Sequence, residues 1–206
     1  MSAEIQAVIF DVGGVLVPFQ MEPALQKLAA KLNLTVEELH EVTGQWRDAW
    51  VTGKMRTEDF WDNVMNDERV TTSASVDELT FTGLGKDWEP EQVLMDFAIG
   101  LKASGYQIAI LSDTITPHAE LIRSKGVYEP FDPVVLSHEV GLRKPDPAIY
   151  QLTLERLGLP AAETVFIDDT PENIEAAKAL GMHGVVCENP DQVQAELIQL
   201  GVTVRP

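Results

Sequence analysis

Short apolar segments alternate with helical segments over most of this chain, and no other feature limits its possible folds as strongly. Five segments are apolar on both faces, as in parallel strands that helices cover on both sides. They are residues 7–10, 107–111, 134–137, 164–167 and 184–186. This order of elements predicts an α/β fold with a doubly wound parallel sheet.

The helices expected between and after these strands end in a consistent way. A glycine lies just past the end of each, where a residue in the left-handed conformation commonly terminates a helix. The segments are 91–104, 117–125, 145–157, 172–180 and 191–200, followed by Gly105, Gly126, Gly158, Gly181 and Gly201. The pattern therefore predicts both the helices and the positions at which they stop.

Residues 17–89 break the alternation, because this stretch holds helical patterns and no strand pattern. Residues 35–38 form a capping box that opens one helix, and a second helix is expected to begin near Thr57. We therefore predict an α/β core domain of residues 1–16 and 90–206 and a helical domain of residues 17–89. Its aromatic residues are typical of the core of a small helical unit, and some are candidates to line a substrate pocket; they are Phe19, Trp46, Trp50, Phe60 and Trp61.

Composition and charge exclude several functions. The net charge is −18 and no Lys/Arg cluster forms a stripe, so a nucleic-acid partner is not expected. The apolar runs are shorter than a membrane span needs, and the first strand begins close to residue 1, so we expect neither a membrane span nor a signal peptide. The single cysteine, Cys187, excludes an internal disulfide. We expect a cytoplasmic protein, and either a monomer or a dimer fits the sequence.

Polar residues follow four of the predicted strands. They are Asp11, the pair Ser112-Asp113, Lys144, and the pair Asp168-Asp169. Because ligands of open parallel sheets bind outside the carboxyl ends of the strands, these residues are expected to converge on one edge. Any one of them alone is typical of a helix cap or a turn. Four sets at one edge predict a functional site.

These residues lie in four segments that together resemble the motifs of the haloacid dehalogenase (HAD) superfamily. The segments are FDVGGVL at 10–16, ILSDT at 110–114, GLRKPDPAIY at 141–150 and FIDDTPENIEAAKALG at 166–181. Their order matches that of the superfamily and they extend over nearly the whole chain. The helical stretch 17–89 resembles the superfamily's C1 cap, a small domain inserted after the first motif.

The resemblance implies a phosphoryl-transfer site that uses Mg²⁺ and acts on a small phosphate ester, such as a sugar phosphate or a nucleotide-like compound. Asp11 would be the nucleophile that forms an aspartyl-phosphate, and Lys144 would supply a fixed positive charge. The other implied roles are phosphate binding by Ser112, Asp113 and Lys144, metal binding by Asp11, Asp169 and the carbonyl of Gly13, and support or alternative ligation by Asp168 and Asn173.

Two positions depart from the superfamily's pattern. Gly13 stands where most phosphatases of the superfamily have a second aspartate, which protonates the leaving group and activates water. Asp113 stands where asparagine is common. We expect the Asp113 carboxylate to point away from phosphate and to cap the helix that begins at residues 116–117.

Three interpretations stay open at this level. The first is an active phosphatase in which water, Asp168 or the substrate carries the proton. The second is a 2-haloacid dehalogenase, which needs neither the second aspartate nor a metal, although the adjacent acids Asp168 and Asp169 favour a metal. The third is a binding or regulatory domain that has kept the fold without activity. The presence of Asp11, Lys144 and Asp169 together favours the first.

Overall fold

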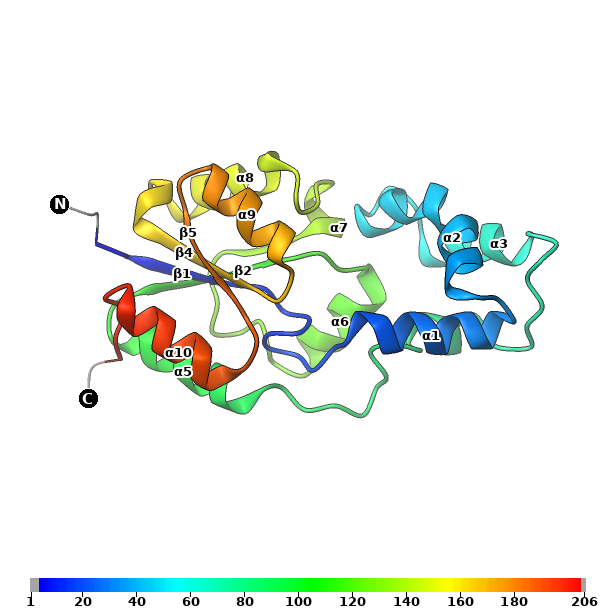
Figure 1. Cartoon of the computed structure of the whole chain (residues 1–206), viewed down its shortest axis with the longest axis horizontal. Helices are drawn as coiled ribbons and strands as arrows, with labels where there is room; N and C mark the ends of the chain where they lie inside the picture. The colour runs from blue at the N-terminus through cyan, green and yellow to red at the C-terminus, as the bar shows by residue number, and fades with distance from the viewer. Residues whose placement is uncertain (1–3, 205–206) are drawn as a thin grey trace.

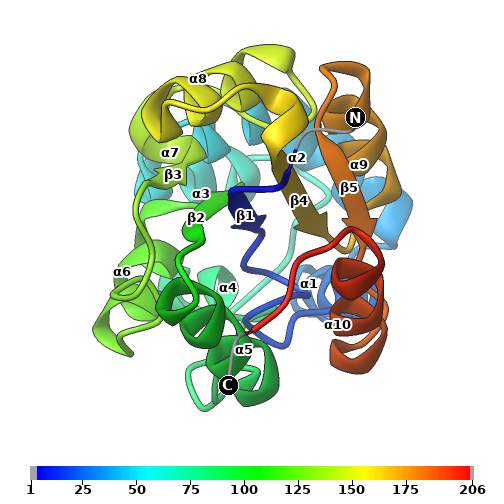
Figure 2. The same ribbon diagram turned by 90° about the vertical axis from the view of Figure 1, so that its left-hand side faces the viewer.

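The computed structural model describes residues 4–204 and contains a five-stranded parallel sheet. The strands are β1 (Ala7–Phe10), β2 (Gln107–Ser112), β3 (Val134–Leu136), β4 (Thr164–Asp168) and β5 (His183–Val186), in the order β3-β2-β1-β4-β5. The central strand β1 pairs on both sides, so that Ile9 lies opposite Ala109 of β2 and Phe166 of β4. The predicted doubly wound sheet is therefore confirmed (Figures 1 and 2).

Helices cover both faces of the sheet because successive strand residues point to opposite sides. Ala7 and Ile9 of β1 pack in one cluster with α8 and α9, whereas Val8 and Phe10 pack with α5, α6 and α10. These two helical layers are visible in Figure 2. Their bounds are α5 Gln92–Ala103, α6 Thr116–Ser124, α8 Pro147–Leu157, α9 Pro171–Ala179 and α10 Pro190–Gln199.

The glycines predicted to end these helices all have a positive φ, between 69° and 99°. The predicted helix starts lie within one residue of the observed ones except for one. Helix α8 begins at Pro147 rather than at residue 145, because the Asp146 side chain accepts a hydrogen bond from the Ala148 amide and so provides the N-cap. The third strand is also shorter than predicted, since Ser137 opens the short helix α7 (Ser137–Val140). A 3₁₀ turn, Ala161–Glu163, precedes β4.

Four further helices, which we call the insert, lie between β1 and α5. They are α1 (Met21–Leu32), α2 (Val36–Val51), α3 (Thr57–Met65) and α4 (Val76–Thr80). The predicted capping box is present, with Thr35 and Glu38 each bonded to the other's backbone amide. The insert has a hydrophobic cluster of its own, which contains Phe60 and Trp61. The domain limits 1–16, 17–89 and 90–206 stay predictions.

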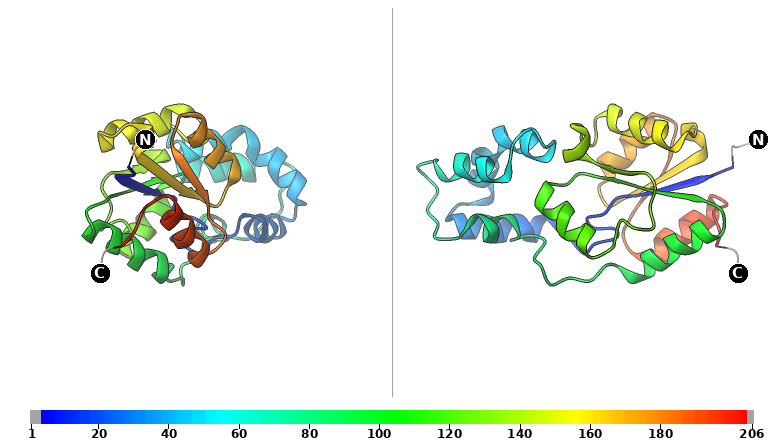
Figure 3. Two further views of the ribbon diagram at one scale, coloured as in Figure 1. Left: turned by 60° about the vertical axis from the view of Figure 1, so that its left-hand side comes forward. Right: turned by 180° about the vertical axis from the view of Figure 1, so that it is seen from behind.

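The insert lies beyond the carboxyl ends of the strands, at the far end of the molecule from both termini (Figures 1 and 3). It contacts the core at separate points. Ser137 Oγ donates to the Val51 carbonyl over 2.8 Å, and His118 Nε2 lies 2.8 Å from the Thr80 carbonyl oxygen. Within residues 4–204, none of the helices combines the length and the apolar character that a membrane crossing requires.

Candidate active site

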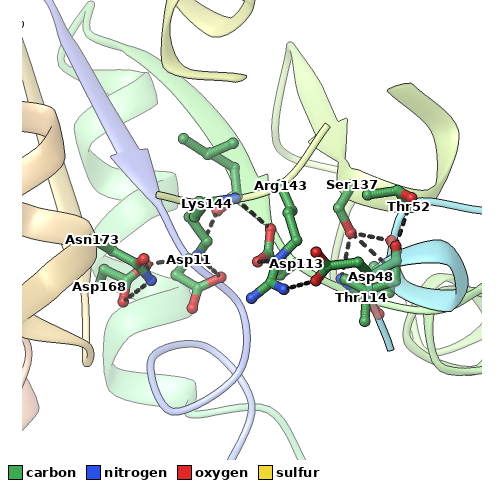
Figure 4. Close-up of polar contacts among 12 residues, drawn as sticks. Asp11, Asp48, Thr52, Asp113, Thr114, Ser137, Arg143, Lys144, Asp168 and Asn173 are labelled. Carbon is green, nitrogen blue, oxygen red and sulfur yellow. Dashed lines mark hydrogen bonds and ion pairs between the residues drawn. The ribbon is translucent and has the colours of Figure 1, made fainter. Parts of the chain in front are cut away.

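Lys144 joins the ends of three strands at the edge of the sheet that faces the insert (Figure 4). Its Nζ donates to Asp168 Oδ2 over 2.6 Å and lies 3.0 Å from Asp11 Oδ1 and 3.4 Å from the Leu111 carbonyl oxygen. The Lys144 side chain is only 2% exposed. A buried ammonium group is tolerated where carboxylates surround it, and here they come from β1 and β4.

Asp168 is held in place from several directions. The Asn173 side-chain amide lies 3.1 Å from both of its carboxylate oxygens, and the Thr170 amide donates to Oδ1 over 2.8 Å. Asp168 is fully buried at the end of β4, and Asn173 lies in the first turns of α9. Asp168, itself held by Asn173, therefore helps to fix the position of Lys144. The supporting role of the two residues in a reaction stays a prediction.

The pKa values of Asp11 and Lys144 depend on both burial and neighbouring charges. Burial raises the pKa of Asp11 to about 7, and Asp168 adds to that effect, whereas Lys144 lowers it. Burial also acts to lower the pKa of Lys144, but the charges of Asp11, Asp168 and Asp113 outweigh burial, so the pKa lies above its usual value. Lys144 is thus a fixed positive charge. Any further positive charge nearby would lower the pKa of Asp11 and favour its ionised form.

Three carboxylates converge beside Lys144. Oxygen atoms of Asp11, Asp168 and Asp169 all lie within 4.8 Å of one another. Burial, followed by the charge of Asp168, raises the pKa of Asp169, whereas the hydrogen bond from Thr170 and the charge of Lys144 oppose the rise. A set of carboxylate oxygens suits a hard cation such as Mg²⁺. The residues present therefore fit a divalent cation.

Gly14 makes room for this cluster. Its φ is +76°, and a Cβ atom at this position would lie 2.3 Å from Asp169 Oδ2. Gly13 differs, since a Cβ there would meet only Phe19 Cδ1 at 3.7 Å, an ordinary contact distance. Of the two glycines, only Gly14 is required by the turn.

The two residues that end and follow β2 have different surroundings. Ser112 is buried at the strand end and lines the cavity described below. Asp113 Oδ1 accepts a hydrogen bond from the Lys144 amide over 3.0 Å, and its Oδ2 lies 3.6 Å from Arg143 Nε. The prediction that Asp113 caps the next helix was wrong, because the N-cap of α6 is Ile115 and has no side-chain hydrogen bond. Asp113 instead fastens the loop that carries Lys144.

A cavity of about 530 Å³ lies between this edge of the sheet and the insert. The core contributes Asp11, Gly13, Ser112, Lys144 and Asp169 to its wall. The insert contributes an apolar surface, which includes Leu25, Leu28, Leu39, Trp50, Phe60 and Trp61. The predicted candidates Phe19, Trp50, Phe60 and Trp61 do line the cavity, whereas Trp46 packs against the insert's own cluster.

One residue that lines the cavity, Arg47, was missed at the level of sequence. Arg47 of α2 lines the cavity, and its neighbour Asp48 forms an ion pair with Arg143 of the core (Figure 4). Burial lowers the pKa of Arg47, and the charge of Arg143 lowers it further. No sequence motif marks Arg47, because its position depends on how α2 packs against the core. The Asp48–Arg143 pair shows that Arg143 links the two parts of the molecule.

A parallel sheet that presents a buried Asp–Lys–Asp network and a carboxylate cluster to a covered cavity has the groups that a hydrolytic or phosphoryl-transfer enzyme needs. Comparisons with known proteins show to which family the chain belongs. A model of the haloacid dehalogenase-like hydrolase family matches residues 5–181. The chain therefore belongs to the haloacid dehalogenase-like hydrolases, as its four motifs predicted.

The chain is also similar in sequence or fold to individual proteins. The chain is 27% identical over 201 residues to the sesquiterpene phosphatase astK of Aspergillus oryzae, covering 97% of this chain and 98% of that protein. It is 31% identical over 204 residues to mouse acyl-CoA dehydrogenase family member 10; the match covers 93% of this chain but only 19% of that longer protein. A magnesium complex of the HAD family enzyme bt-2542 from Bacteroides thetaiotaomicron has the same fold, with a TM-score of 0.74, 22% identity and coverage of 89% and 93% of the two chains.

Proposed function

We propose that this protein is a Mg²⁺-dependent phosphatase that hydrolyses small phosphomonoesters through an aspartyl-phosphate on Asp11. The observation that carries the proposal is the burial of Lys144 between Asp11 and Asp168 at the floor of a cavity. A carboxylate nucleophile beside a fixed ammonium group suits attack on a negatively charged phosphoryl group. The phosphatase named among the full-length relatives supports the same reaction.

The reaction would take place in two displacements. An oxygen of Asp11 forms a bond to phosphorus while the ester P–O bond breaks and the alcohol leaves. Water then attacks phosphorus, which releases inorganic phosphate and restores the Asp11 carboxylate. Lys144 stabilises the charge on the phosphoryl oxygens in both steps, and the Ser112 hydroxyl donates a hydrogen bond to one of them.

The metal would be held by Asp11, Asp169 and the Gly13 carbonyl, with Asp168 as an alternative ligand. When bound, Mg²⁺ supplies positive charge to the phosphoryl oxygens and to the carboxylate cluster. The added charge opposes the rise in the pKa of Asp11 that burial causes, and so favours the ionised nucleophile. The magnesium complex of a structure with the same fold supports the choice of metal.

The proton for the leaving group needs a source other than residue 13, which is glycine. Asp168 is poorly suited, because Lys144, Asn173 and the Thr170 amide already occupy its oxygens. We therefore assign this proton to water in the cavity. Without a positioned acid, esters with poor leaving groups are expected to react about 10²–10⁴-fold more slowly than with one.

The test is release of inorganic phosphate from an aryl phosphate, with Mg²⁺ or with EDTA. We expect Mg²⁺-dependent turnover that Asp11→Asn lowers by at least about 10³-fold, because the amide cannot act as the nucleophile. Asp191→Asn, which changes an exposed aspartate in the first turn of α10, is the matched control and should retain full activity. Metal-independent halide release from a 2-haloacid would support the dehalogenase interpretation instead. Lack of turnover of aryl, alkyl, sugar and nucleotide phosphates alike would support the binding domain.

A further inference from the structure

The wall of the cavity that the insert contributes is apolar and rigid. Leu25 and Leu28 lie one turn apart on α1 and both line it. The ring of Trp50 stacks on that of Phe60, with centroids 3.9 Å apart and an angle of 16° between the planes. Stacked rings that also contact Trp61 form a surface that cannot easily rearrange around a ligand.

The polar groups in this wall already have partners within the protein. Trp50 Nε1 donates to Thr57 Oγ1 over 3.0 Å, and Trp61 Nε1 donates to Thr80 Oγ1 over 2.8 Å. The Thr80 hydroxyl in turn donates to the Val76 carbonyl over 2.7 Å. These donors are therefore unavailable to a ligand.

Two further groups are occupied in the same way. Thr43 Oγ1 donates to the Leu39 carbonyl over 2.7 Å, and His118 Nε2 lies 2.8 Å from the Thr80 carbonyl oxygen. Among the described residues that line the insert's side of the cavity, this leaves only His40 and Arg47 as polar side chains without such a bond. A ligand rich in hydroxyl groups would lose its hydrogen bonds to water here and find few replacements.

Arg47 marks the boundary between the apolar wall and the charged floor. Its guanidinium group interacts electrostatically with Arg143 and Asp113, which belong to the loops after β3 and β2. Charged side chains thus lie at the core end of the cavity, where Lys144 and Arg143 stand among carboxylates that the proposed Mg²⁺ would further neutralise. Among the described residues that line it, the far end has no charged side chain. The cavity as a whole is complementary to a molecule with an anionic head and an apolar body.

We infer that the physiological substrate is a phosphomonoester of a hydrophobic alcohol, whose apolar body lies against the leucines and stacked rings of the insert. This inference rests on the proposed phosphatase function and specifies its substrate class. It differs from the sugar and nucleotide-like esters that the sequence alone suggested. The volume of about 530 Å³ lies in the usual range of small-molecule sites, about 300–1,000 Å³.

The decisive comparison uses substrates with the same leaving-group type. We would measure kcat/KM for n-alkyl phosphates of increasing chain length and for a six-carbon polyol phosphate, all esters of primary alcohols. We expect kcat/KM to rise up to about fourfold per added methylene until the cavity is filled. Hexyl phosphate should exceed the polyol ester by at least about 100-fold. No dependence on chain length, or equal hydrolysis of the polyol ester, would overturn the inference.

A pair of leucine variants locates the effect. Leu28→Gln places an amide in the cavity wall and should lower kcat/KM for decyl phosphate at least about tenfold, with little change for ethyl phosphate. Leu34→Gln changes another half-buried leucine of the same cluster that does not line the cavity, and should leave both values unchanged. An equal loss in the two variants would assign the effect to stability and contradict the inference.

Binding measurements separate this inference from the proposed function. Alkylphosphonates have no ester bond to break, so their affinity for the unmodified protein in Mg²⁺ reports on the cavity alone. Affinity that rises with chain length, in a protein that hydrolyses no phosphate ester, would support the apolar site and reject the phosphatase. Turnover of esters with no effect of chain length on phosphonate affinity would reject the apolar site and leave the phosphatase standing.

Discussion

The two walls of the cavity are built on different physical principles. In the core wall, charged groups are fixed by other charged groups, as Lys144 is by Asp11 and Asp168. In the insert wall, apolar groups are fixed by packing, as Trp50 is by Phe60. The core wall comes from the ends of strands in one sheet, whereas the insert wall comes from three or more helices packed against each other.

This difference suggests that the core wall serves catalysis and the insert wall serves substrate binding. In the proposed reaction, the charges of the core wall act on the phosphoryl group, so changes there should alter kcat and stability together. The insert wall would contact the organic part of the substrate, so changes there should alter mainly KM. The predictions below test that division, beginning with the largest effect.

Removing the central charge should have the largest effect. Lys144→Met leaves Asp11 and Asp168 buried without their cation, which costs about 3–5 kcal/mol of unfolding free energy. It also removes a positive charge from the phosphoryl group, so we expect kcat to fall by about 10³-fold. Urea unfolding and aryl phosphate turnover would measure the two effects.

A surface lysine supplies the matched control for this change. Lys86 pairs with Asp77 at 2.8 Å, but both side chains are more than half exposed. Lys86→Met should therefore cost no more than about 1 kcal/mol and leave kcat unchanged. If the two lysine variants were equally stable, the network around Lys144 would not hold the core wall together.

The two adjacent glycines should respond differently to the same substitution. Gly14→Ala forces an alanine into a left-handed conformation, which costs about 1–2 kcal/mol, and its Cβ would displace the Asp169 carboxylate. We therefore expect lower stability and a higher Mg²⁺ concentration for half-maximal activity. Gly13→Ala meets only Phe19 at an ordinary distance and should change neither quantity. Similar effects of both substitutions would contradict the assignment of the turn to Gly14.

Gly13→Asp tests whether the missing acid limits the reaction. The position lines the cavity and has space for a Cβ atom, so a carboxyl group could be introduced there beside the proposed phosphoryl site. We expect at least about a tenfold rise in kcat for an alkyl phosphate and little change for an aryl phosphate, whose leaving group needs less protonation. Stopped-time phosphate release with both substrates would measure this. Equal changes on both substrates would argue against general acid catalysis by the new side chain.

The sequence predicted the core wall well, for a physical reason. In a parallel sheet the carboxyl ends of the strands meet at one edge, so the order of strands is enough to bring Asp11, Lys144 and Asp168 together. The start of α8 and the role of Asp113 were predicted wrongly. Both depend on side-chain hydrogen bonds, from Asp146 to its own helix and from Asp113 to the Lys144 amide, that local patterns do not specify.

The insert wall was predicted much less completely. Only α2 and α3 were placed from the sequence, near Thr35 and Thr57, and the capping box at Thr35 followed from four residues of sequence. Helices α1 and α4 were not placed individually. That Trp50 rather than Trp46 faces the cavity, however, depends on the rotation of α2 against α3 and on the angle between the insert and the core. No sequence feature predicted that Arg47 lines the cavity, for the same reason. Tertiary packing, and not the local sequence, decides which residues of the insert line the cavity.

The smallest predicted effect concerns the contact between the two walls. Burial lowers the pKa of His118, whose Nε2 contacts the Thr80 carbonyl of the insert. The unfolded chain therefore binds this proton more readily than the folded one, and protonation favours unfolding. The resulting stability is present above the unfolded-state pKa of about 6.5 and is lost as the pH falls below it.

His118→Gln keeps a side-chain donor for the Thr80 carbonyl but removes the titrating group. We expect its urea midpoint to fall less steeply between pH 7.5 and pH 5 than that of the unmodified protein. His40→Gln, which removes an exposed histidine from α2, is the matched control and should keep the original slope. Because His118 belongs to α6 and Thr80 to α4, protonation would loosen the insert from the core without touching the network around Lys144. A parallel change in kcat would show instead that the two walls do not act independently.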